Sequence, residues 1–251
     1  PAVARNFSLA IQSVGMTAAA YLIIRNRHPV EYAYLLPVSA GGVAGIVWGA
    51  WFVAPFVAPP YAKMLFVTFW LSFGMVLFYI NSVYRRRVVS SLPPLRVRDR
   101  LEMVVVGILG GTLTAVLGSG IDIFSFSYVT MRYHLSEKVA TPTSVVIMAV
   151  NSIFGFLVHL LFIRDISSEV VNYWLVSIPV VLVGAPLGAF FINNKTRYFV
   201  VRLLYLVILV QFAGALIILR PSGTLLIFTL STLVVGLIFF FGYSAQFLKK
   251  G

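Results

Sequence analysis

The residues that could do chemistry in this chain are a few polar ones set inside long apolar segments. Gly118, Ser119 and Gly120 interrupt one such segment, and Asp122 is the only acidic residue well inside an apolar run. In a bilayer, a broken helix is tolerated only where protein or a water-filled cavity satisfies the freed backbone groups, so the break indicates a substrate site. This pattern predicts transport of a small polar substrate, and nothing in it calls for catalysis.

Two interpretations of Asp122 are open, and both can hold. A buried ionisable group in a membrane is costly and by default marks a path for ions or protons. Alternatively, Asp122 caps the second half of the broken helix by accepting hydrogen bonds from free backbone N–H groups. An ionised Asp122 would repel an anion, so if it faces the substrate we expect a proton to bind together with the anion.

A second polar group follows the broken segment at Thr141, Pro142, Thr143 and Ser144. The pattern predicts a helix start, with Thr141 as the cap and Pro142 at the first helical position. Helix starts present free N–H groups and positive potential, which suit an anion such as a sulfonate or sulfite oxygen. The alternative is an ordinary capped span near the membrane face.

Further polar residues lie near the chain start and in the helix after the break. Asn6 and Ser8 stand at the start of the first apolar segment, beside Arg5, which either pairs with an anion or is a terminal surface charge. Gln12 and Asn151 lie nearer mid-depth, where a binding role competes with helix-to-helix hydrogen bonds worth about 0.6 kcal/mol each on average. All four uncharged residues are candidate substrate-binding residues.

The composition of the chain indicates the environment in which these residues lie. The chain has 251 residues, of which 60% are hydrophobic and 10% charged. A soluble domain needs about a quarter charged residues, so the chain is predicted to be an all-α, polytopic protein of the cell membrane with the lipid bilayer as a partner. Because there is no cysteine and His28, His134 and His159 lie far apart, we expect no metal site and no cofactor.

The net charge of +12 also has a simple explanation in a membrane protein. The basic residues sit almost entirely between apolar segments, as in loops held at the cytoplasmic face. Nucleic-acid binding is therefore the weaker interpretation.

The apolar pattern predicts seven long segments and one broken one. The broken segment, Leu101–Met131, would be about 46 Å long as a helix, too long for one span and too short for two. It is therefore a re-entrant hairpin or a strongly kinked helix, and the hairpin places most loop cations on one face, as the orientation rule requires. The long segments are Phe7–Ile24, Tyr32–Val57, Met64–Tyr84, Val139–Ile163, Val170–Ile192, Phe199–Leu219 and Thr224–Phe247.

Weak internal similarity predicts two related halves. Residues 4–11 can be laid on 140–147, and residues 45–52 on 184–191. With the hairpin, the halves run in opposite senses, as in the inverted repeats of many secondary transporters. We expect a first repeat at residues 1–84, a basic cytoplasmic linker at 85–100, a second repeat at 101–222 and a terminal helix at 223–251. The first half lacks a counterpart of the broken segment, which suggests that residue 1 is not the biological start.

Glycines recur at spacings that let helices approach closely, so we expect them to serve packing. They are Gly41, Gly42, Gly45, Gly49, Gly184 and Gly188.

Several of these stretches resemble a known family. Residues 107–120 (GILGGTLTAVLGSG), 140–144 (ATPTS) and 184–188 are similar to the second half of the sulfite exporter TauE/SafE family, and residues 12–19 to the matching helix of its first half. The resemblance implies an integral membrane transporter that exports sulfite, sulfoacetate or other small organosulfur anions. Where the family continues with glycines and a proline, this chain has residues 121–125 (IDIFS), which add the carboxylate of Asp122.

Two other function classes are rivals to a transporter. A membrane subunit that only anchors a larger complex would have Asp122, Asn151 and the glycine break facing neighbouring helices, with no cavity between. An intramembrane enzyme is disfavoured because the chain has no Ser–His pair at a plausible spacing, no double-aspartate site and no metal set. The oligomeric state and the coupling ion are left open by the sequence.

Overall fold

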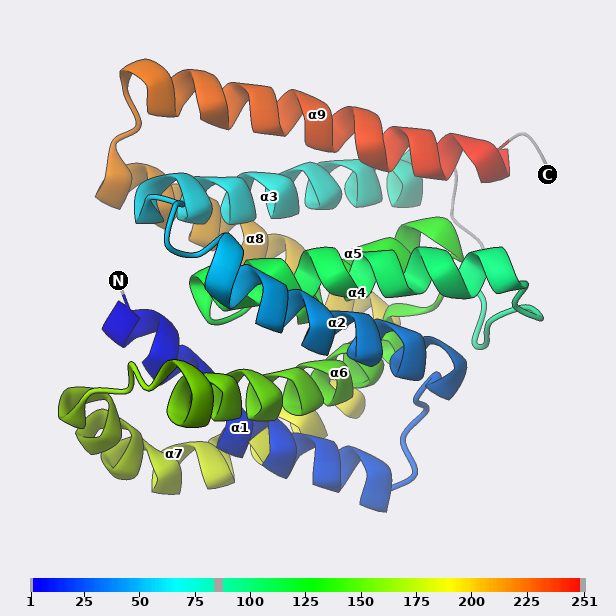
Figure 1. The fold of residues 1–251 in the computed structure, drawn as a ribbon. Helices are drawn as coiled ribbons and strands as arrows, with labels where there is room; N and C mark the ends of the chain where they lie inside the picture. The colour runs from blue at the N-terminus through cyan, green and yellow to red at the C-terminus, as the bar shows by residue number, and fades with distance from the viewer. Residues whose placement is uncertain (1, 84–87, 249–251) are drawn as a thin grey trace.

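The structure is a computed structural model that describes residues 2–83 and 88–248, and these residues form a bundle of helices (Figure 1). Within them no strand forms, and one isolated bridge joins Val89 to Leu135. The all-α prediction is therefore confirmed. The helices are α1 (Ala2–Arg25), α2 (Tyr32–Phe52), α3 (Pro59–Val83), α4 (Val97–Leu117), α5 (Ile121–Arg132), α6 (Glu137–Leu157), the π-helix η1 (Val158–Ile163), α7 (Ser168–Asn193), α8 (Arg197–Leu219) and α9 (Gly223–Leu248).

Eight spans in the described part of the chain are long and apolar enough to cross a bilayer, with α6 and η1 forming one continuous span. Lipid offers no partner to backbone N–H and C=O groups, so these apolar runs must satisfy their own groups as helices. Helix α5 is the exception, because its 12 residues reach only about 18 Å. The chain is a polytopic membrane protein, as its composition predicts.

The broken segment is a re-entrant hairpin. Helix α4 ends at Leu117, and Gly118 follows with a left-handed φ of 83°. Helix α5 then returns along α4. Evidence for this is the hydrogen bond that the Tyr128 hydroxyl, near the end of α5, donates to Oε2 of Glu102, near the start of α4, at 3.0 Å. Both ends of the hairpin thus lie at the same face of the bundle, which confirms the hairpin and rejects a kinked helix that crosses to the opposite face.

This face, where α2, α4, α6 and α8 begin, is called the basic face; the opposite face carries the starts of α1, α3, α7 and α9. The orientation rule predicts that the basic face is the cytoplasmic one, and this assignment stays a prediction. Arg85–Arg87, Lys249 and Lys250 also belong to the predicted basic set but lie outside the described residues. Described cations at the basic face are Arg25, Arg27, Arg96, Arg98, Arg100, Arg132, Lys138, Lys195 and Arg197.

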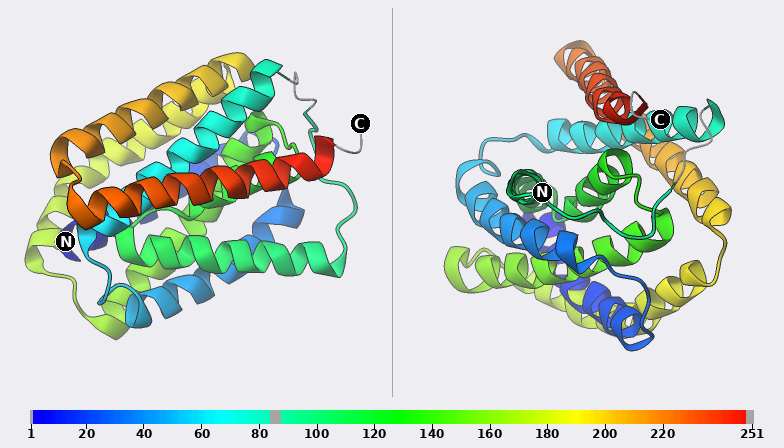
Figure 2. Two further views of the ribbon diagram at one scale, coloured as in Figure 1. Left: turned by 90° about the horizontal axis from the view of Figure 1, so that it is seen from above. Right: turned by 90° about the vertical axis from the view of Figure 1, so that its right-hand side faces the viewer.

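Helices α1, α2 and α3 begin at the opposite faces from α6, α7 and α8 respectively. This is the direction that an inverted repeat requires, and the repeat itself stays a prediction. Helices α3 and α9 lie on one side of the bundle and α1, α6 and α7 on the other, with α2, α4 and α5 between them (Figure 1). Helix α8 flanks this stack, as the end-on view in Figure 2 shows.

Glycines bring α2 and α4 into backbone contact. A Cβ added at Gly41 or Gly45 would overlap the carbonyl oxygen of Val104 or Ile108. Gly111 of α4 is placed in the same way against the carbonyl oxygen of Gly42. The packing role predicted for the glycines of α2 is therefore confirmed.

The same prediction is wrong for Gly184 and Gly188. In the described part of the chain nothing lies within 4 Å of a Cβ added at either one. Helix α7 packs on α1 through other residues, with Val181 and Ala185 set against Gly15. Gly188 instead borders a cavity between α1, α6 and α7, and Gly184 has open space beside it.

Candidate functional site

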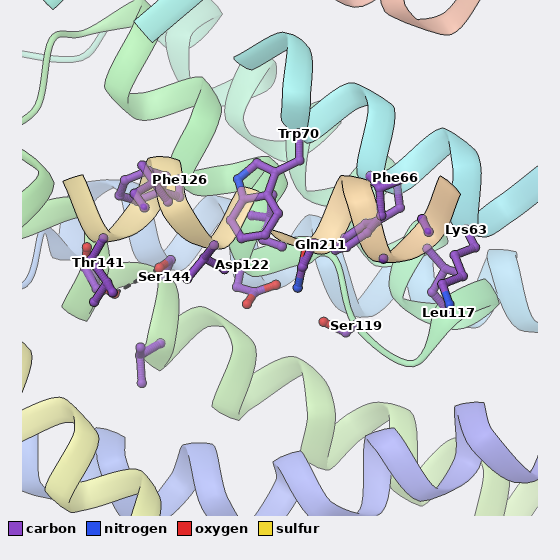
Figure 3. Close-up of a pocket in the computed structure, with 18 of the residues that line it drawn as sticks. Lys63, Phe66, Trp70, Leu117, Ser119, Asp122, Phe126, Thr141, Ser144 and Gln211 are labelled. Atoms are coloured by element: carbon purple, nitrogen blue, oxygen red, sulfur yellow. Dashed lines mark hydrogen bonds between the residues drawn. The ribbon is translucent and has the colours of Figure 1, made fainter. Parts of the chain in front are cut away.

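A cavity of about 740 Å³ lies beside the break, between α3, α6 and α8; we call it the main cavity (Figure 3). Its size is that of a small-molecule site. Most of the wall is apolar or aromatic, including Phe66, Trp70 and Phe126. The polar residues of the wall are Lys63, Ser119, Asp122, Thr141, Ser144 and Gln211.

The break is built so that Ser119 and Asp122 can reach this cavity. Gly118 has a positive φ, and a Cβ added there would lie 2.6 Å from both the Arg5 carbonyl oxygen and Ser8 Cβ. Only glycine combines this conformation with so close an approach. A hydrogen bond stabilises the turn: the Ile121 N–H donates to the Thr114 hydroxyl at 2.9 Å.

Helix α1 satisfies the carbonyl group that the break sets free. The Gly118 carbonyl oxygen accepts from the Ser8 hydroxyl at 3.1 Å and from Gln12 Nε2 at 3.0 Å, and Gln12 also donates to Ser8 Oγ at 2.7 Å. Unsatisfied backbone groups in a bilayer are costly, so these bonds support the bent conformation. Ser8 and Gln12 therefore hold the break and do not line the main cavity.

Asp122 is the second residue of α5, and the N-cap position belongs to Gly120. Asp122 is therefore not the N-cap residue itself, but its carboxylate interacts with the backbone N–H groups of Gly120, Asp122 and Ile123 in the first turn, where the helix dipole favours negative charge. The predicted capping of this helix start by the Asp122 oxygens is thus supported. Asp122 Oδ1 is buried and has no hydrogen-bond partner among the described residues. In Figure 3 the Asp122 and Gln211 side chains extend into the same space from α5 and α8. A buried acceptor left open in this way is ready for a proton or for a donor on a ligand.

The prediction of a helix start at Thr141 and Pro142 is wrong. Helix α6 begins at Glu137, and its N-cap is Ser136, whose hydroxyl accepts from the Lys138 N–H at 3.4 Å. A serine cap followed by an acidic first turn begins the helix five residues earlier, and Pro142 is accommodated inside it at the expense of one backbone hydrogen bond.

Thr141 and Ser144 consequently offer hydroxyl groups to the main cavity and no free N–H groups. The Ser144 hydroxyl donates to the Thr141 carbonyl at 2.9 Å and keeps its acceptor capacity. Thr143 points elsewhere, because its hydroxyl donates to the Val139 carbonyl at 2.7 Å and accepts from the Glu31 N–H at 3.0 Å. Of the three hydroxyl residues proposed here, two reach the cavity.

Asn151 is fully buried against α2. Its Nδ2 donates to the Ile147 carbonyl at 2.9 Å, and a Cβ added at Gly42 would overlap its Oδ1. Asn151 thus lies outside the main cavity, at a helix contact.

Asn6 belongs to a polar cluster at the opposite face. Asn6 Nδ2 donates to the Asp165 carbonyl at 3.0 Å, and the Asp165 carboxylate pairs with Arg5 at 2.6 Å and with His159 Nδ1 at 2.8 Å. Burial raises the pKa of Asp165, but the bonds from His159 and Asn6 and the charge of Arg5 hold that pKa below its usual value. Arg5 is therefore engaged by a carboxylate, and its description as a terminal surface charge is wrong.

Comparison with known families matches residues 1–216 to the sulfite exporter TauE/SafE family. The chain belongs to this family. No curated protein and no solved structure matches it.

The TauE/SafE match covers α1 to α7 and most of α8, so it includes all the polar residues of the main cavity, while α9 lies beyond it. The family is one of membrane transporters, which agrees with the eight apolar spans.

Three cavity residues of this TauE/SafE protein were missed by sequence reasoning. Gln211 is a polar residue in the middle of an apolar span, the same signal that singled out Gln12, and it could have been found in that way. Lys63, at the start of α3, stands at the cavity rim (Figure 3). Trp70 carries a buried indole N–H that has no partner in the described residues, a feature that only the packed structure reveals.

Proposed function

We propose that the protein exports small sulfur-containing anions, such as sulfite, sulfoacetate or other organosulfonates, through the main cavity. The observation that carries this proposal is the polar patch of Ser119, Asp122 and Gln211 in a mostly apolar cavity of about 740 Å³ at a helix break. Membership of a transporter family supports the same conclusion and implies that the chain is not an enzyme.

The wall has groups suited to an oxyanion. Lys63 supplies positive charge at the rim, while Gln211 and the hydroxyl of Ser119 supply hydrogen-bond donors. Asp122 is the group that would repel an anion, so protonation of its open oxygen accompanies binding and gives a proton-coupled cycle. An inside-negative membrane potential already favours the exit of a monovalent anion by about 2.3 kcal/mol per 100 mV.

The two halves of the chain form the inverted repeat in this proposal, with α6, α7 and α8 as the counterparts of α1, α2 and α3. Their opposite directions across the membrane support this division. The rival function, a subunit that only anchors a complex, required the break and Asp122 to face helices with no cavity between. The main cavity beside Asp122 favours transport over that rival.

The test is transport by the purified protein in vesicles, with sulfite, sulfonates and carboxylates as substrates. We expect sulfur anions to move, and we expect Asp122→Asn to change both the rate and its dependence on pH. Glu169→Gln, which alters an exposed carboxylate at the start of α7, is the matched control and should behave as wild type. If no anion moves while the protein is folded, or if Asp122→Asn retains the wild-type rate and pH profile, the proposed mechanism is wrong.

A further inference from the structure

The main cavity holds a carboxylate that no cation of the described chain neutralises. Asp122 Oδ1 is buried without a hydrogen-bond partner, and no Lys, Arg or His of the described residues forms an ion pair with this side chain. Glu137 and Asp165, by contrast, each pair with an arginine at 2.6 Å, namely Arg197 and Arg5. A buried charge is costly unless it is paired, so Asp122 leaves a position open for a positive group of a ligand.

The charges on the cavity wall are one negative and one positive. Among the described wall residues, Asp122 and Lys63 are the only ionisable ones. They stand apart, because Lys63 is at the rim near the start of α3, whereas Trp70, about 10 Å further along this helix, extends towards Asp122 (Figure 3). Such a wall is complementary to a ligand that carries one charge of each sign.

We propose that the main cavity is selective for sulfonates that also carry an ammonium group, that is, for small aminosulfonate zwitterions. The ammonium pairs with Asp122, and the sulfonate accepts hydrogen bonds from Gln211 and Ser119 in the field of Lys63. This inference rests on the proposed function, because it assumes that the main cavity carries a sulfonate. It names the substrate class more closely: the ammonium of the ligand takes the place of the proton that a simple anion needs on Asp122.

Aromatic side chains beside Asp122 also favour an ammonium there. Trp70 lines the cavity from α3, and Phe126 follows Asp122 by one turn on the same face of α5. Aromatic rings attract cations over their faces, and the attraction is larger where water is excluded. An ammonium at this place therefore gains from the carboxylate and from the aromatic wall, whereas a sulfonate would be repelled by the carboxylate.

The sulfonate end of the ligand has its own partners in the cavity. Gln211 extends into the same space as Asp122 and offers the two N–H donors of its amide (Figure 3). Ser119 adds a hydroxyl donor, and Lys63 adds positive charge at the rim. These donors lie on the wall beside the carboxylate, so one short ligand can place its two charged groups on groups of opposite polarity.

The first test compares three ligands on the wild-type protein in vesicles, so it does not depend on the folding of a variant. Aminoethanesulfonate carries both charges, hydroxyethanesulfonate replaces its ammonium by a hydroxyl, and aminoethanol replaces its sulfonate by a hydroxyl. We expect aminoethanesulfonate to reach half-maximal transport at a concentration about tenfold lower than either of the others, the effect of one charged hydrogen bond.

The pH dependence gives a second readout. An aliphatic ammonium stays charged at mildly acid and at neutral pH. Transport of aminoethanesulfonate should therefore be the same at both, whereas transport of hydroxyethanesulfonate should fall as the pH rises, because it needs a proton on Asp122. Lys63 is the other ionisable residue of the described wall, and as a lysine it keeps its charge over this range.

The variant Asp122→Asn tests the residue that recognises the ammonium. It should raise the half-maximal concentration of aminoethanesulfonate about tenfold and lower that of hydroxyethanesulfonate, because the repelling charge is gone. Glu169→Gln, which changes an exposed carboxylate at the start of α7, is the matched control and should keep the wild-type preference.

The outcomes separate this selectivity from the proposed function. If hydroxyethanesulfonate moves as well as aminoethanesulfonate in wild type, or if Asp122→Asn keeps the preference, the selectivity is refuted while sulfonate transport stands. If aminoethanol moves as well as aminoethanesulfonate, the sulfonate is not recognised and the zwitterion proposal is refuted. If no sulfonate and no sulfite moves while the protein is folded, the proposed function fails as well.

Discussion

The substitution Gly118→Ala tests whether the break in the hairpin is built for glycine. Gly118 has a φ of 83°, and its carbonyl oxygen accepts two hydrogen bonds from α1. Adding one methyl group perturbs both features. It places a side chain in a left-handed conformation, and it brings Cβ to 2.6 Å from the Arg5 carbonyl oxygen and from Ser8 Cβ.

The magnitude follows from these two effects. A left-handed conformation costs a non-glycine residue about 1–2 kcal/mol. Overlap in a well-packed site costs about 1–3 kcal/mol more, because the Arg5 carbonyl is backbone and cannot rotate away. The sum is about 2–5 kcal/mol, and for a chain of this size each kcal/mol lowers the melting temperature by roughly 2–4 °C.

Thermal unfolding of the purified protein in detergent, followed by tryptophan fluorescence, measures this effect. We expect Gly118→Ala to melt at least about 4 °C lower than wild type and to transport more slowly, because α1 must move away from the break. Gly184→Ala is the control, since nothing lies near its added Cβ and alanine is the better helix former. A Gly118→Ala protein with wild-type melting and wild-type transport would refute this account of the break.

Three further results are expected. Gln12→Leu removes a donor to the Gly118 carbonyl, so it should lower the unfolding free energy by about 1–3 kcal/mol and slow transport; wild-type behaviour would mean that α1 does not support the break. Gly45→Ala would overlap a backbone carbonyl of α4, so a melting curve should show a loss of about 1–3 kcal/mol, and an unchanged curve would contradict the close helix contact. Asp165 has a lowered folded-state pKa, so its contribution to stability is present above the unfolded-state pKa, about 3.9, and is lost as the pH falls through the lower folded-state value. The melting temperatures of wild type and Asp165→Asn should therefore converge in acid, and a difference that stays constant with pH would contradict this.

The sequence by itself determined the membrane character and the helical class. It favoured the re-entrant hairpin over a strongly kinked helix, and with the hairpin the face on which most loop charges lie. These features depend on local properties: hydropathy, segment length, the conformational freedom of glycine and the distribution of basic residues along the chain. The stretch 118–122 could be identified as site-like for the same reason, since a break and a carboxylate in an apolar run are visible without neighbours.

Only the tertiary structure decided which polar residues share a cavity. Gln12 and Asn151 have the same sequence signal as Gln211, yet the first supports a backbone carbonyl, the second packs on Gly42, and only Gln211 faces open space. The predicted start of α6 at Thr141 was wrong for a similar reason. The helix begins at the Ser136 cap, and Pro142 is tolerated in its second turn. A polar residue inside a span must find a partner, but its sequence position does not say whether that partner is protein or substrate. Which of the two it is depends on the neighbouring helices. Here α8 flanks the hairpin and leaves a cavity beside Asp122, so Gln211 and Asp122 face open space.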